Sequence, residues 1–327
     1  MKAIVQERFG PPEDLRLADI DVPEAGPDQV LVRVRAAALN PYDWHMLRGD
    51  PYIARLMGGV GFTRPKARVA GIDAAGVVET VGDNVRDLQV GDEVLGFCAG
   101  AFAEYALARG DRVVPKPAGM TFEEAAALPL AAITALVALR DVGRVRSGQR
   151  VLVNGAGGGI GTYAVQIGVA LGAEVAGVCG TDKAGLVRSL GATEVIDYTV
   201  EDFTERRGRY DMILDNVGNR SLRDVRRALT PTGTLALNGG GAPGKLFGAV
   251  GNIVRAVVVN GVVRQRLKPF IAKPTREDLL TLTGYVEDGK LTSVVGETYP
   301  LAEAAKGLRI VEQGHARGKI VLTVDGN

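Results

Sequence analysis

RVLVNGAGGGIGTYAVQIGVALGA, the stretch from Arg150 to Ala173, decides the fold of this chain. It begins with an apolar run, Val151–Val153, that predicts a buried strand, and after a glycine-rich turn it continues with an apolar pattern typical of a helix. The turn has the spacing of the G-x-G-x-x-G dinucleotide fingerprint, with alanine in place of the first glycine. Because such a turn brings backbone N–H groups at a helix N-terminus close to a pyrophosphate, the stretch predicts nucleotide binding. The three small residues are Ala156, Gly158 and Gly161, and additional glycines stand at 155, 157 and 159.

Four further short β-rich runs follow this stretch, with helical segments between them. A lone glycine-rich turn is weak evidence, since such turns also occur wherever a helix and a strand pack closely. The succession of strands and helices strengthens it because it predicts right-handed crossovers in a doubly wound parallel sheet, an α/β fold. The predicted strands are Ala173–Val178, Glu194–Asp197, Met212–Asp215 and Thr234–Leu237, and Leu186–Ala192 closes a second helix.

The first part of the chain, up to about Met120, has a different pattern, with short alternating runs separated by Gly, Pro and Asp. It predicts a β-rich, barrel-like domain. The run VLVRVRA (Val30–Ala36) alternates with a period of two, so one set of side chains faces a core and the other does not. Val30, Val32 and Val34 share one face, and Leu31, Arg33 and Arg35 share the other.

A helix start marks the boundary between the two parts. Thr121 with Glu124 three residues later is a capping box, and an alanine-rich helical pattern follows it up to residue 143. The fifth strand of the second part is followed by an irregular, glycine-rich stretch. After it we expect a helix in REDLLTLTGYVEDGK, and one amphipathic helix and a strand near the end of the chain.

Composition excludes several classes of function. At 327 residues, two domains are expected, and 39 Lys and Arg against 38 Asp and Glu leave no broad basic field for nucleic acid. No apolar run approaches the ~20 residues that span a bilayer, and the N-terminus MKAIVQERFG has no apolar core of a signal peptide, so a soluble, cytoplasmic protein is expected. Cys98 and Cys179 are too few for a disulfide framework or a four-cysteine zinc site.

Several ordered segments accompany the glycine-rich stretch: GIDAAGVVETVGDNV, VGDEVLGF, FAEYALA, LPLAAITAL, SLGATEVIDYT and HARGKIVLTV. Together they resemble the zinc-free (zeta-crystallin-like) quinone oxidoreductase branch of the medium-chain dehydrogenase/reductase superfamily. The resemblance covers essentially the whole chain. It implies a GroES-like β-barrel catalytic domain at residues 1–122, completed by residues 285–327, and a Rossmann NADP-binding domain at residues 123–284. It also implies NADPH-dependent hydride transfer to quinones or other α,β-unsaturated carbonyl compounds.

The zinc-dependent members of the superfamily have ligands that this chain lacks. The resemblance aligns their ligating cysteine with Asn40, and their His-Glu pair with Ile72 and Asp73. Catalytic zinc needs three protein ligands, and Ile72 cannot be one of them. Asp43 and His45 form an alternative metal pair, although solvated or hydrogen-bonded side chains are the simpler interpretation. We therefore expect no metal.

Without a metal, hydrogen-bond donors have to stabilise negative charge that develops on the substrate carbonyl. In the segment LNPYDW, Asn40 and Tyr42 match the substrate-side loop of the family, so the catalytic candidates are an amide and a phenol. The alternative is that Asn40 is a turn residue before Pro41 and that Tyr42 packs in the barrel.

The remaining candidates concern the cofactor and follow the resemblance. One group lies in the glycine-rich turn. A second group follows predicted strands at the carboxyl edge of the sheet, where ligands bind in open α/β folds. Thr134 is placed on the nicotinamide side, although a threonine within a helix is often only a core residue. The cofactor-binding candidates are Thr134, Ala156, Gly157, Gly158, Gly159, Ile160, Gly161, Thr181, Lys183, Tyr198, Asn216, Val217, Asn238, Gly239 and Gly240.

The end of the second strand predicts NADPH as the cofactor. NAD-specific relatives place an acid there, which repels a 2′-phosphate, whereas this chain has Cys179. Thr181 and Lys183 are able to donate to the phosphate. Asp182 would oppose this preference if it turned inward, so we expect it to face solvent.

The substrate is expected to be a small lipophilic carbonyl compound or quinone, because flexible, apolar sequence follows the fifth strand. Its pocket would combine residues of the stretch from Gly239 to Ala272 with aromatic residues of the N-terminal part. Two other functions stay open: a 2-enoyl thioester reductase, and a non-catalytic NADPH-binding sensor or partner-binding protein. Residues from Val257 to Val263 also allow a homodimer interface. The apolar candidates are Leu246, Phe247, Val250, Ile253, Tyr42, Trp44, Tyr52 and Phe62, and the basic residues for a thioester are Lys245, Arg255, Arg264, Arg266 and Lys268.

Overall fold

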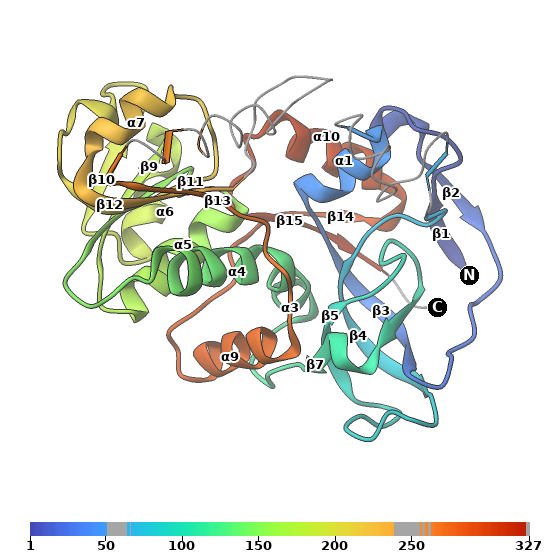
Figure 1. The fold of residues 1–327 in the computed structure, drawn as a ribbon. Coiled ribbons are helices and arrows are strands. Elements are labelled where there is room, and N and C mark those ends of the chain that lie inside the picture. Colours follow the sequence, from blue (N-terminus) through green and yellow to red (C-terminus); the bar gives the residue numbers. More distant parts are fainter. Residues whose placement is uncertain (51–63, 66, 239–255, 257–258, 261–262, 325–327) are drawn as a thin grey trace. The chain divides into compact units, whose positions relative to one another are not determined.

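The computed structural model describes the chain except for residues 51–63, 66, 239–255, 257–258, 261–262 and 325–327. The chain forms two compact units, each with its own sheet (Figure 1). The first unit comprises Met1–Ala131 and Pro274–Asn327, and the second comprises Ala132–Lys273.

A six-stranded parallel sheet forms the centre of the second unit. The strands lie in the order β10-β9-β8-β11-β12-β13, which in chain order is 3-2-1-4-5-6, the arrangement of a Rossmann fold. The predicted doubly wound sheet is therefore confirmed. The strands are β8 (Arg150–Asn154), β9 (Glu174–Cys179), β10 (Glu194–Asp197), β11 (Tyr210–Asp215), β12 (Leu229–Leu237) and β13 (Arg266–Pro269).

The sixth strand, β13, is absent from the prediction, which treats the chain after β12 as irregular. In β13 only Leu267 is buried, and Arg266 is exposed. The strand lies at the edge of the sheet, so a single inward side chain leaves no alternating pattern to recognise.

Helices cover both faces of this sheet. In Figure 1, α7 lies on one face and α5 on the other. The apolar pattern of the deciding stretch explains the burial of α5, in which residues 161–168 are all buried. The helical elements are α4 (Pro129–Leu136), within which the chain passes from the first unit to the second, η3 (Val137–Gly143), α5 (Gly159–Ala170), η4 (Thr181–Lys183), α6 (Ala184–Ser189), η5 (Phe203–Glu205) and α7 (Leu222–Ala228).

The first unit contains a seven-stranded sheet in the order β14-β15-β3-β4-β5-β7, with β6 also paired to β3, and a separate β1-β2 pair. Neighbouring strands are antiparallel except β14 and β15. In β3 the predicted alternation holds for Val30, Val32 and Val34, which are buried, and for Arg35, which is exposed. It fails at Leu31, which was predicted on the other face and is also buried. The strands are β1 (Lys2–Val5), β2 (Arg16–Asp19), β3 (Gln29–Leu39), β4 (Asp73–Val81), β5 (Glu93–Phe97), β6 (Tyr105–Arg109), β7 (Val113–Pro115), β14 (Val295–Pro300) and β15 (Lys319–Thr323).

The predicted capping box is present at the start of α3. Thr121 Oγ1 accepts a hydrogen bond from the Glu124 backbone N–H, and the Glu124 carboxylate accepts one from the Thr121 N–H. The predicted single helix is split into α3 and α4 because Pro129 has no N–H to continue the hydrogen bonding. The helical elements of this unit are η1 (Pro12–Asp14), α1 (Pro41–Arg48), η2 (Gly110–Arg112), α3 (Phe122–Ala127), α9 (Arg276–Glu287), η6 (Leu301–Glu303) and α10 (Ala304–Gln313).

The first unit ends at Ala131, after the sequence boundary at residue 122, and resumes at Pro274, before the sequence boundary at residue 284. The helices α3 and α9 belong to the first unit because α3 packs against β3, β4 and β15, and α9 packs against β7. Among the helices that the structure describes, none has the length and apolar character needed to cross a membrane.

Candidate functional site

The strand order of the second unit reverses between β8 and β11, and polar side chains stand where these two strands end. Asn154 Nδ2 donates to Asp215 Oδ1 at 2.9 Å, and the same oxygen accepts the N–H groups of Val217 (3.1 Å) and Gly218 (2.9 Å). In open α/β sheets ligands bind at the carboxyl edge beside such a reversal. Asn154 and Asp215 were missed by the sequence analysis, although both end predicted neighbouring strands.

The glycine-rich turn between β8 and α5 has the close approaches that its sequence predicts. A Cβ on Gly161 would lie 2.1 Å from the Gly155 carbonyl oxygen and 2.6 Å from Ala156 Cα, so no larger residue fits without moving backbone. Gly155 has a φ of 84°, which favours glycine. The helix α5 begins at Gly159, and its first N–H groups have no partner within the helix. This geometry leaves donors for an anion at the turn.

Lys183 lies over this turn. A Cβ on Gly157 would come within 2.8 Å of Lys183 Cδ and 2.9 Å of its Cβ, so the lysine stem packs against the bare glycine backbone. Tyr198 follows the neighbouring strand β10, with its hydroxyl 3.3 Å from the position of a Cβ on Gly180. Its side chain is 48% exposed. The structure therefore brings Lys183 and Tyr198 to the ends of β9 and β10, beside the turn.

The other predicted phosphate contact, Thr181, is bonded to the protein itself. Its hydroxyl donates to the carboxylate of Asp197, the last residue of β10. Hydrogen bonds from Thr181 and Thr199 lower the pKa of Asp197, so this carboxylate is charged at neutral pH. Thr181 thus gives its hydroxyl hydrogen to Asp197 in this arrangement. Sequence analysis missed Asp197, although it directly precedes Tyr198 in the segment VIDYT.

Asn216 and Asn238 lie on the nicotinamide side of the predicted site, at the ends of β11 and β12. Asn238 Nδ2 donates to Asn216 Oδ1 at 3.1 Å. Asn216 Nδ2 is buried and has no hydrogen-bond partner among the residues that the structure describes. A buried, unpaired donor at the carboxyl edge fits the carboxamide of a nicotinamide.

The other predicted cofactor residues are placed as follows. Thr134 is buried within α4. Gly239 and Gly240 lie outside the described residues, as do the predicted pocket residues Tyr52 and Phe62 and those from 246 to 253. The small-residue turn, the lysine above it and the unpaired Asn216 amide together fit a dinucleotide.

The first unit holds a buried polar cluster at the end of β3. Asn40 Nδ2 donates to Asp73 Oδ2 (3.0 Å) and to the Ala38 carbonyl (3.2 Å), while Asn40 Oδ1 accepts from Lys319 Nζ (2.5 Å). The Asn40 N–H donates to Asp43 Oδ2 at 2.8 Å. Asn40, Asp43, Asp73 and Lys319 are all at most 5% exposed.

Burial sets the electrostatics of this cluster. It raises the pKa of Asp43 to about 8 and that of Asp73 to about 6, although the Lys319 ammonium opposes both shifts. Burial lowers the pKa of Lys319, against the attraction of the two carboxyl groups. At neutral pH the Asp43 carboxyl therefore keeps its proton, while the Asp73 carboxyl, with the lower pKa, is the more readily ionised of the two.

The two predicted catalytic residues have different surroundings. Both amide hydrogens of Asn40 are bonded within the cluster, so a bond from Asn40 to a substrate would require one of them to open. Tyr42, in the first turn of α1, is 43% exposed. Burial of its ring, and next the nearby Asp43, raise the pKa of its phenol, which keeps it protonated. Of the two, Tyr42 has the donor that solvent reaches.

The positions of the zinc ligands in related enzymes are occupied by this same cluster or lie beside it. Asn40 donates to Asp73 Oδ2 and accepts from Lys319 Nζ. His45, the alternative ligand, stacks on Trp44 with ring centroids 3.6 Å apart. Zinc independence of this chain stays a prediction.

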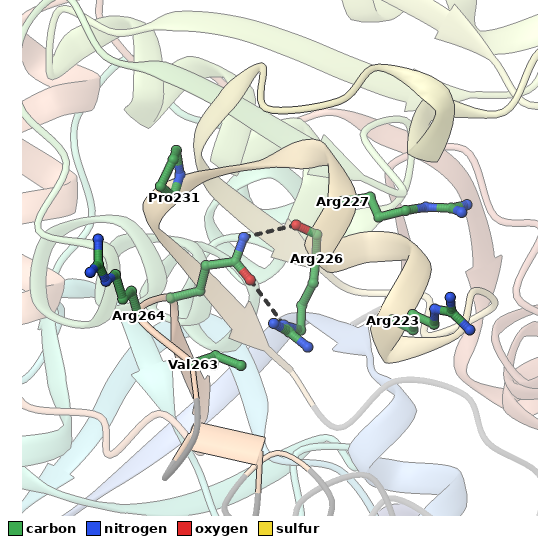
Figure 2. Close-up of a pocket in the computed structure, with 7 residues that line it drawn as sticks. Arg223, Arg226, Arg227, Pro231, Val263 and Arg264 are labelled. Atoms are coloured by element: carbon green, nitrogen blue, oxygen red, sulfur yellow. Dashed lines mark hydrogen bonds between the residues drawn. The ribbon is translucent and has the colours of Figure 1, made fainter.

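A hollow of about 410 Å³ lies on the second unit, away from the predicted cofactor residues. It is lined by three arginines of α7, by Pro231 and by residues 263–265 (Figure 2). Arg226 Nε donates to Gln265 Oε1 (2.9 Å), and Gln265 Nε2 donates back to the Arg226 carbonyl (2.8 Å). Pro231 and Gln265 lie at the amino ends of β12 and β13. Arg264, a candidate for thioester binding, is therefore at the edge of the sheet opposite to Asn216.

The comparisons with known proteins agree with this architecture. The profile of the alcohol dehydrogenase GroES-like domain matches residues 26–118, and that of a zinc-binding dehydrogenase domain matches residues 190–322. The two profiles match parts of the first and second units and the C-terminal strands.

Three similar proteins cover nearly the whole chain. The bovine mitochondrial NAD(P)H oxidoreductase RTN4IP1 is 33% identical, with 99% of this chain and 89% of that protein covered. The chloroplastic NADPH-dependent alkenal/one oxidoreductase of Arabidopsis thaliana is 34% identical, with 98% and 79% covered. The crystal structure of Escherichia coli quinone oxidoreductase complexed with NADPH has a TM-score of 0.84 at 25% identity, with 99% of this chain and 100% of that chain covered. From its fold, its glycine turn and these relatives, the chain belongs to the zinc-free quinone oxidoreductase branch of the medium-chain dehydrogenase/reductase superfamily.

Proposed function

We propose that this oxidoreductase uses NADPH to reduce quinones or other α,β-unsaturated carbonyl compounds, without zinc. The observation that carries the proposal is the donor set at the carboxyl edge of the second unit: the glycine turn with Lys183 above it, and the unpaired Asn216 amide. Relatives named for NADPH-dependent reduction of alkenals and for reduction of quinones support the same chemistry.

The residues of the second unit bind the cofactor in parts. The backbone N–H groups at the start of α5 hold the pyrophosphate, and Lys183 with Tyr198 holds the 2′-phosphate of the adenosine ribose. Asn216 donates to the nicotinamide carboxamide, and Thr134 lines the same side. Bound NADPH supplies the hydride, and the protein supplies orientation and hydrogen bonds.

In the first unit, the donor to the substrate carbonyl is the Tyr42 phenol. Its partial exposure and raised pKa keep a proton available at the first turn of α1. A hydrogen bond at this position stabilises negative charge that develops on the carbonyl oxygen. Asn40 acts on the substrate through its hold on this turn, because its own amide hydrogens are taken by Asp73 and Ala38.

The 2-enoyl thioester alternative has weaker support. It needs basic side chains around the mouth of the substrate site, and two of its candidates, Arg264 and Arg266, lie at the amino end of β13, opposite to the predicted nicotinamide side. Lys268 lies near the carboxyl end of the same strand. Lys245 and Arg255 are outside the described residues. A non-catalytic NADPH-binding sensor would turn over none of the acceptors, so any measured turnover excludes that alternative.

A panel assay tests the proposal. NADPH oxidation is followed with 1,4-naphthoquinone, an alkenal and a 2-enoyl thioester, and NADP⁺ reduction is followed with ethanol. We expect turnover of the quinone and the alkenal, with no loss after dialysis against a chelator. Turnover of ethanol alone, or one equivalent of tightly bound zinc per chain, would refute the proposal, and a marked preference for the thioester would replace the substrate class.

The variant Tyr42→Phe tests the donor. Loss of one hydrogen bond to developing charge is expected to lower kcat about ten- to a hundredfold while the Kd for NADPH stays the same. Tyr285→Phe, which removes a hydroxyl from α9 of the same unit, is the matched control and keeps the wild-type kcat. Unchanged turnover in Tyr42→Phe would assign its ring to packing.

Two further properties stay predictions. A measurement of molecular size in solution tests the homodimer, and cell fractionation tests the cytoplasmic location.

A further inference from the structure

A lysine is buried in the first unit. Lys319 is 3% exposed, and its ammonium donates to the Leu39 carbonyl (3.1 Å) and to Asn40 Oδ1 (2.5 Å). Removing an ammonium from water costs several kcal/mol, and well-packed apolar residues are often as stable or more stable in such places. Stability alone therefore gives a weak reason for a lysine here.

The sheet explains how Lys319 reaches Asn40. The strand β3 lies between β15 and β4, with Leu39 opposite Ile320 on one side and Ala38 opposite Asp73 on the other. Lys319 begins β15 and Asp73 begins β4, so their side chains approach the end of β3 from its two neighbours. Asn40 stands between them, immediately after β3.

Asn40 is also the residue from which α1 starts. It is the N-cap, followed by Pro41 and Tyr42 in the first turn, and its own N–H is held by the Asp43 carboxyl. Every polar atom of the Asn40 side chain is bonded within the cluster: Oδ1 to Lys319, and Nδ2 to Asp73 and Ala38. The direction of α1 at its start is thus fixed by the Asn40 side chain.

Asp73 extends the cluster to another helix. Its Oδ2 also accepts the backbone N–H of Leu130, at the start of α4, at 3.2 Å. Its Oδ1 is buried without a hydrogen-bond partner among the described residues. The Lys319 ammonium favours the charged form of Asp73, and without it only the hydrogen bonds from Asn40 and Leu130 would do so.

We propose that Lys319 is a positioning residue for the reaction, because its bond to Asn40 holds the first turn of α1 in the orientation that presents the Tyr42 hydroxyl to the substrate. The expected effect on kcat rests on the proposed function. The inference itself does not depend on zinc, and it does not depend on the cofactor residues either, because these belong to the second unit.

The kinetic test compares Lys319→Met with Lys306→Met. Lys306 lies on α10 of the same unit, exposed and paired with Glu303, so its replacement removes an equal charge at the surface. Misplacement of a donor by a fraction of an ångström is expected to lower kcat roughly ten- to a hundredfold in Lys319→Met. The KM for NADPH stays within about twofold, and the kinetic isotope effect with NADPH deuterated at the transferred position rises as chemistry becomes limiting. Lys306→Met keeps wild-type values.

The double variant Lys319→Met/Asp73→Asn separates positioning from stability. Removing both charges is expected to restore the unfolding midpoint, because no uncompensated carboxylate remains. Asn40 Oδ1 still lacks its donor, so kcat stays low. Recovery of kcat together with the unfolding midpoint, or a wild-type kcat in folded Lys319→Met, would overturn the proposal.

A readout without turnover distinguishes this proposal from the proposed function. Trp44 is the single tryptophan of the chain, lies on α1 and packs against the core of the first unit. Its emission is expected to shift to longer wavelength in Lys319→Met and in the double variant, and not in Lys306→Met. If the wild-type protein reduced none of the acceptors, the proposed function would fail, while the Trp44 shift would still support or refute the hold of Lys319 on α1.

Discussion

The two candidate regions of this protein have opposite hydrogen-bond patterns. At the carboxyl edge of the second unit, donors are left over: the first N–H groups of α5 have no partner within the helix, and the buried Asn216 Nδ2 has none among the residues that the structure describes. At the end of β3 in the first unit, Asn40 and Lys319 give their hydrogens to oxygens of the protein itself. Since unpaired buried donors are costly, the first pattern is typical of a ligand site and the second of a support for neighbouring groups.

The largest effect is expected in the glycine turn, because the donors that it offers to a ligand are backbone N–H groups. In Gly161→Ala the new Cβ would lie 2.1 Å from the Gly155 oxygen and 2.6 Å from Ala156 Cα, so the turn has to deform. We expect the Kd for NADPH to rise by more than about a hundredfold and the free energy of unfolding to fall by about 3 kcal/mol. Isothermal titration and denaturant unfolding measure the two quantities.

Gly185→Ala is the matched control for this variant. Gly185 lies in α6, and a Cβ there would have no atom within 4 Å. Alanine in a helix is expected to raise the free energy of unfolding by about 0.5–1 kcal/mol, with NADPH binding unchanged. Equal NADPH binding by both variants would contradict the placement of the pyrophosphate at the turn.

The second effect concerns Lys183, whose ammonium contributes a positive charge to the proposed phosphate site. If its ammonium binds the 2′-phosphate, Lys183→Ala loses a charge-assisted hydrogen bond of about 1.5–3 kcal/mol, so the KM for NADPH rises about ten- to a hundredfold. The KM for NADH, which has no such phosphate, is the internal control and is expected to change little. A parallel rise in both constants would limit Lys183 to packing over Gly157.

The third effect is on stability and belongs to the buried cluster. Because burial raises the pKa of Asp43 to about 8, above the ~3.9 of an unfolded aspartate, the folded chain keeps a proton that the unfolded chain loses. The free energy of unfolding therefore falls as the pH rises from about 4 to 8. Asp73, with a pKa of about 6, adds to the fall up to that pH, whereas the lowered pKa of Lys319 acts in the opposite direction in the alkaline range.

Asp43→Asn sharpens this prediction because the amide oxygen still accepts the Asn40 N–H but has no charge to bury. We expect the variant to match wild type at pH 5 and to be more stable by on the order of 2 kcal/mol at pH 8.5. The groups that face Asp43 are Asp73, Lys319 and Tyr42, and all remain. Urea unfolding across this pH range measures the difference, and identical slopes for both proteins would exclude Asp43 as the titrating group.

The sequence predicted the second unit better than the first because its signals are local. One strand, one turn and one helix in a row predict the nucleotide-binding start of the unit, and the alternation of strands and helices after it predicts a doubly wound parallel sheet. Five of its six strands follow from short apolar runs. The edge strand β13 could not be predicted, since Leu267 is its only buried residue. The cluster around Asn40 joins residues 40, 73 and 319, which are brought together by strand pairing between distant segments. Lys319 is quoted within HARGKIVLTV, but nothing in that segment indicates that its ammonium is buried.

The same distinction explains the outcome for individual site residues. Lys183 and Tyr198 follow directly from strands that the sequence predicts, and the structure places both beside the turn. The partner of Thr181 was not predicted, because Asp197 comes from the next strand and the pairing of β9 with β10 decides their contact.

The smallest effect is expected at Asp197, which combines the internal hydrogen bonds of the Asn40 cluster with a position beside the predicted ligand site. Its carboxylate is satisfied by the hydroxyls of Thr181 and Thr199, as in a supporting cluster, yet it ends β10 beside the site proposed for the 2′-phosphate. Since hydrogen bonding keeps Asp197 charged, it repels a bound phosphate dianion through solvent. Asp197→Asn retains an acceptor for Thr181 and loses the charge.

We therefore expect the KM for NADPH to fall about three- to fivefold in Asp197→Asn, with the KM for NADH nearly unchanged. The difference is expected to shrink in 0.5 M salt, because the Debye length there is only about 4 Å. Asp211→Asn removes the same charge at the amino end of β11, on the opposite edge of the sheet, and is expected to leave both constants unchanged. A rise in the KM for NADPH in Asp197→Asn would mean that Asp197 supports the phosphate site by orienting Thr181. The carboxyl edge of the second unit would then also contain side chains that bond to one another and support the site, as those around Asn40 do.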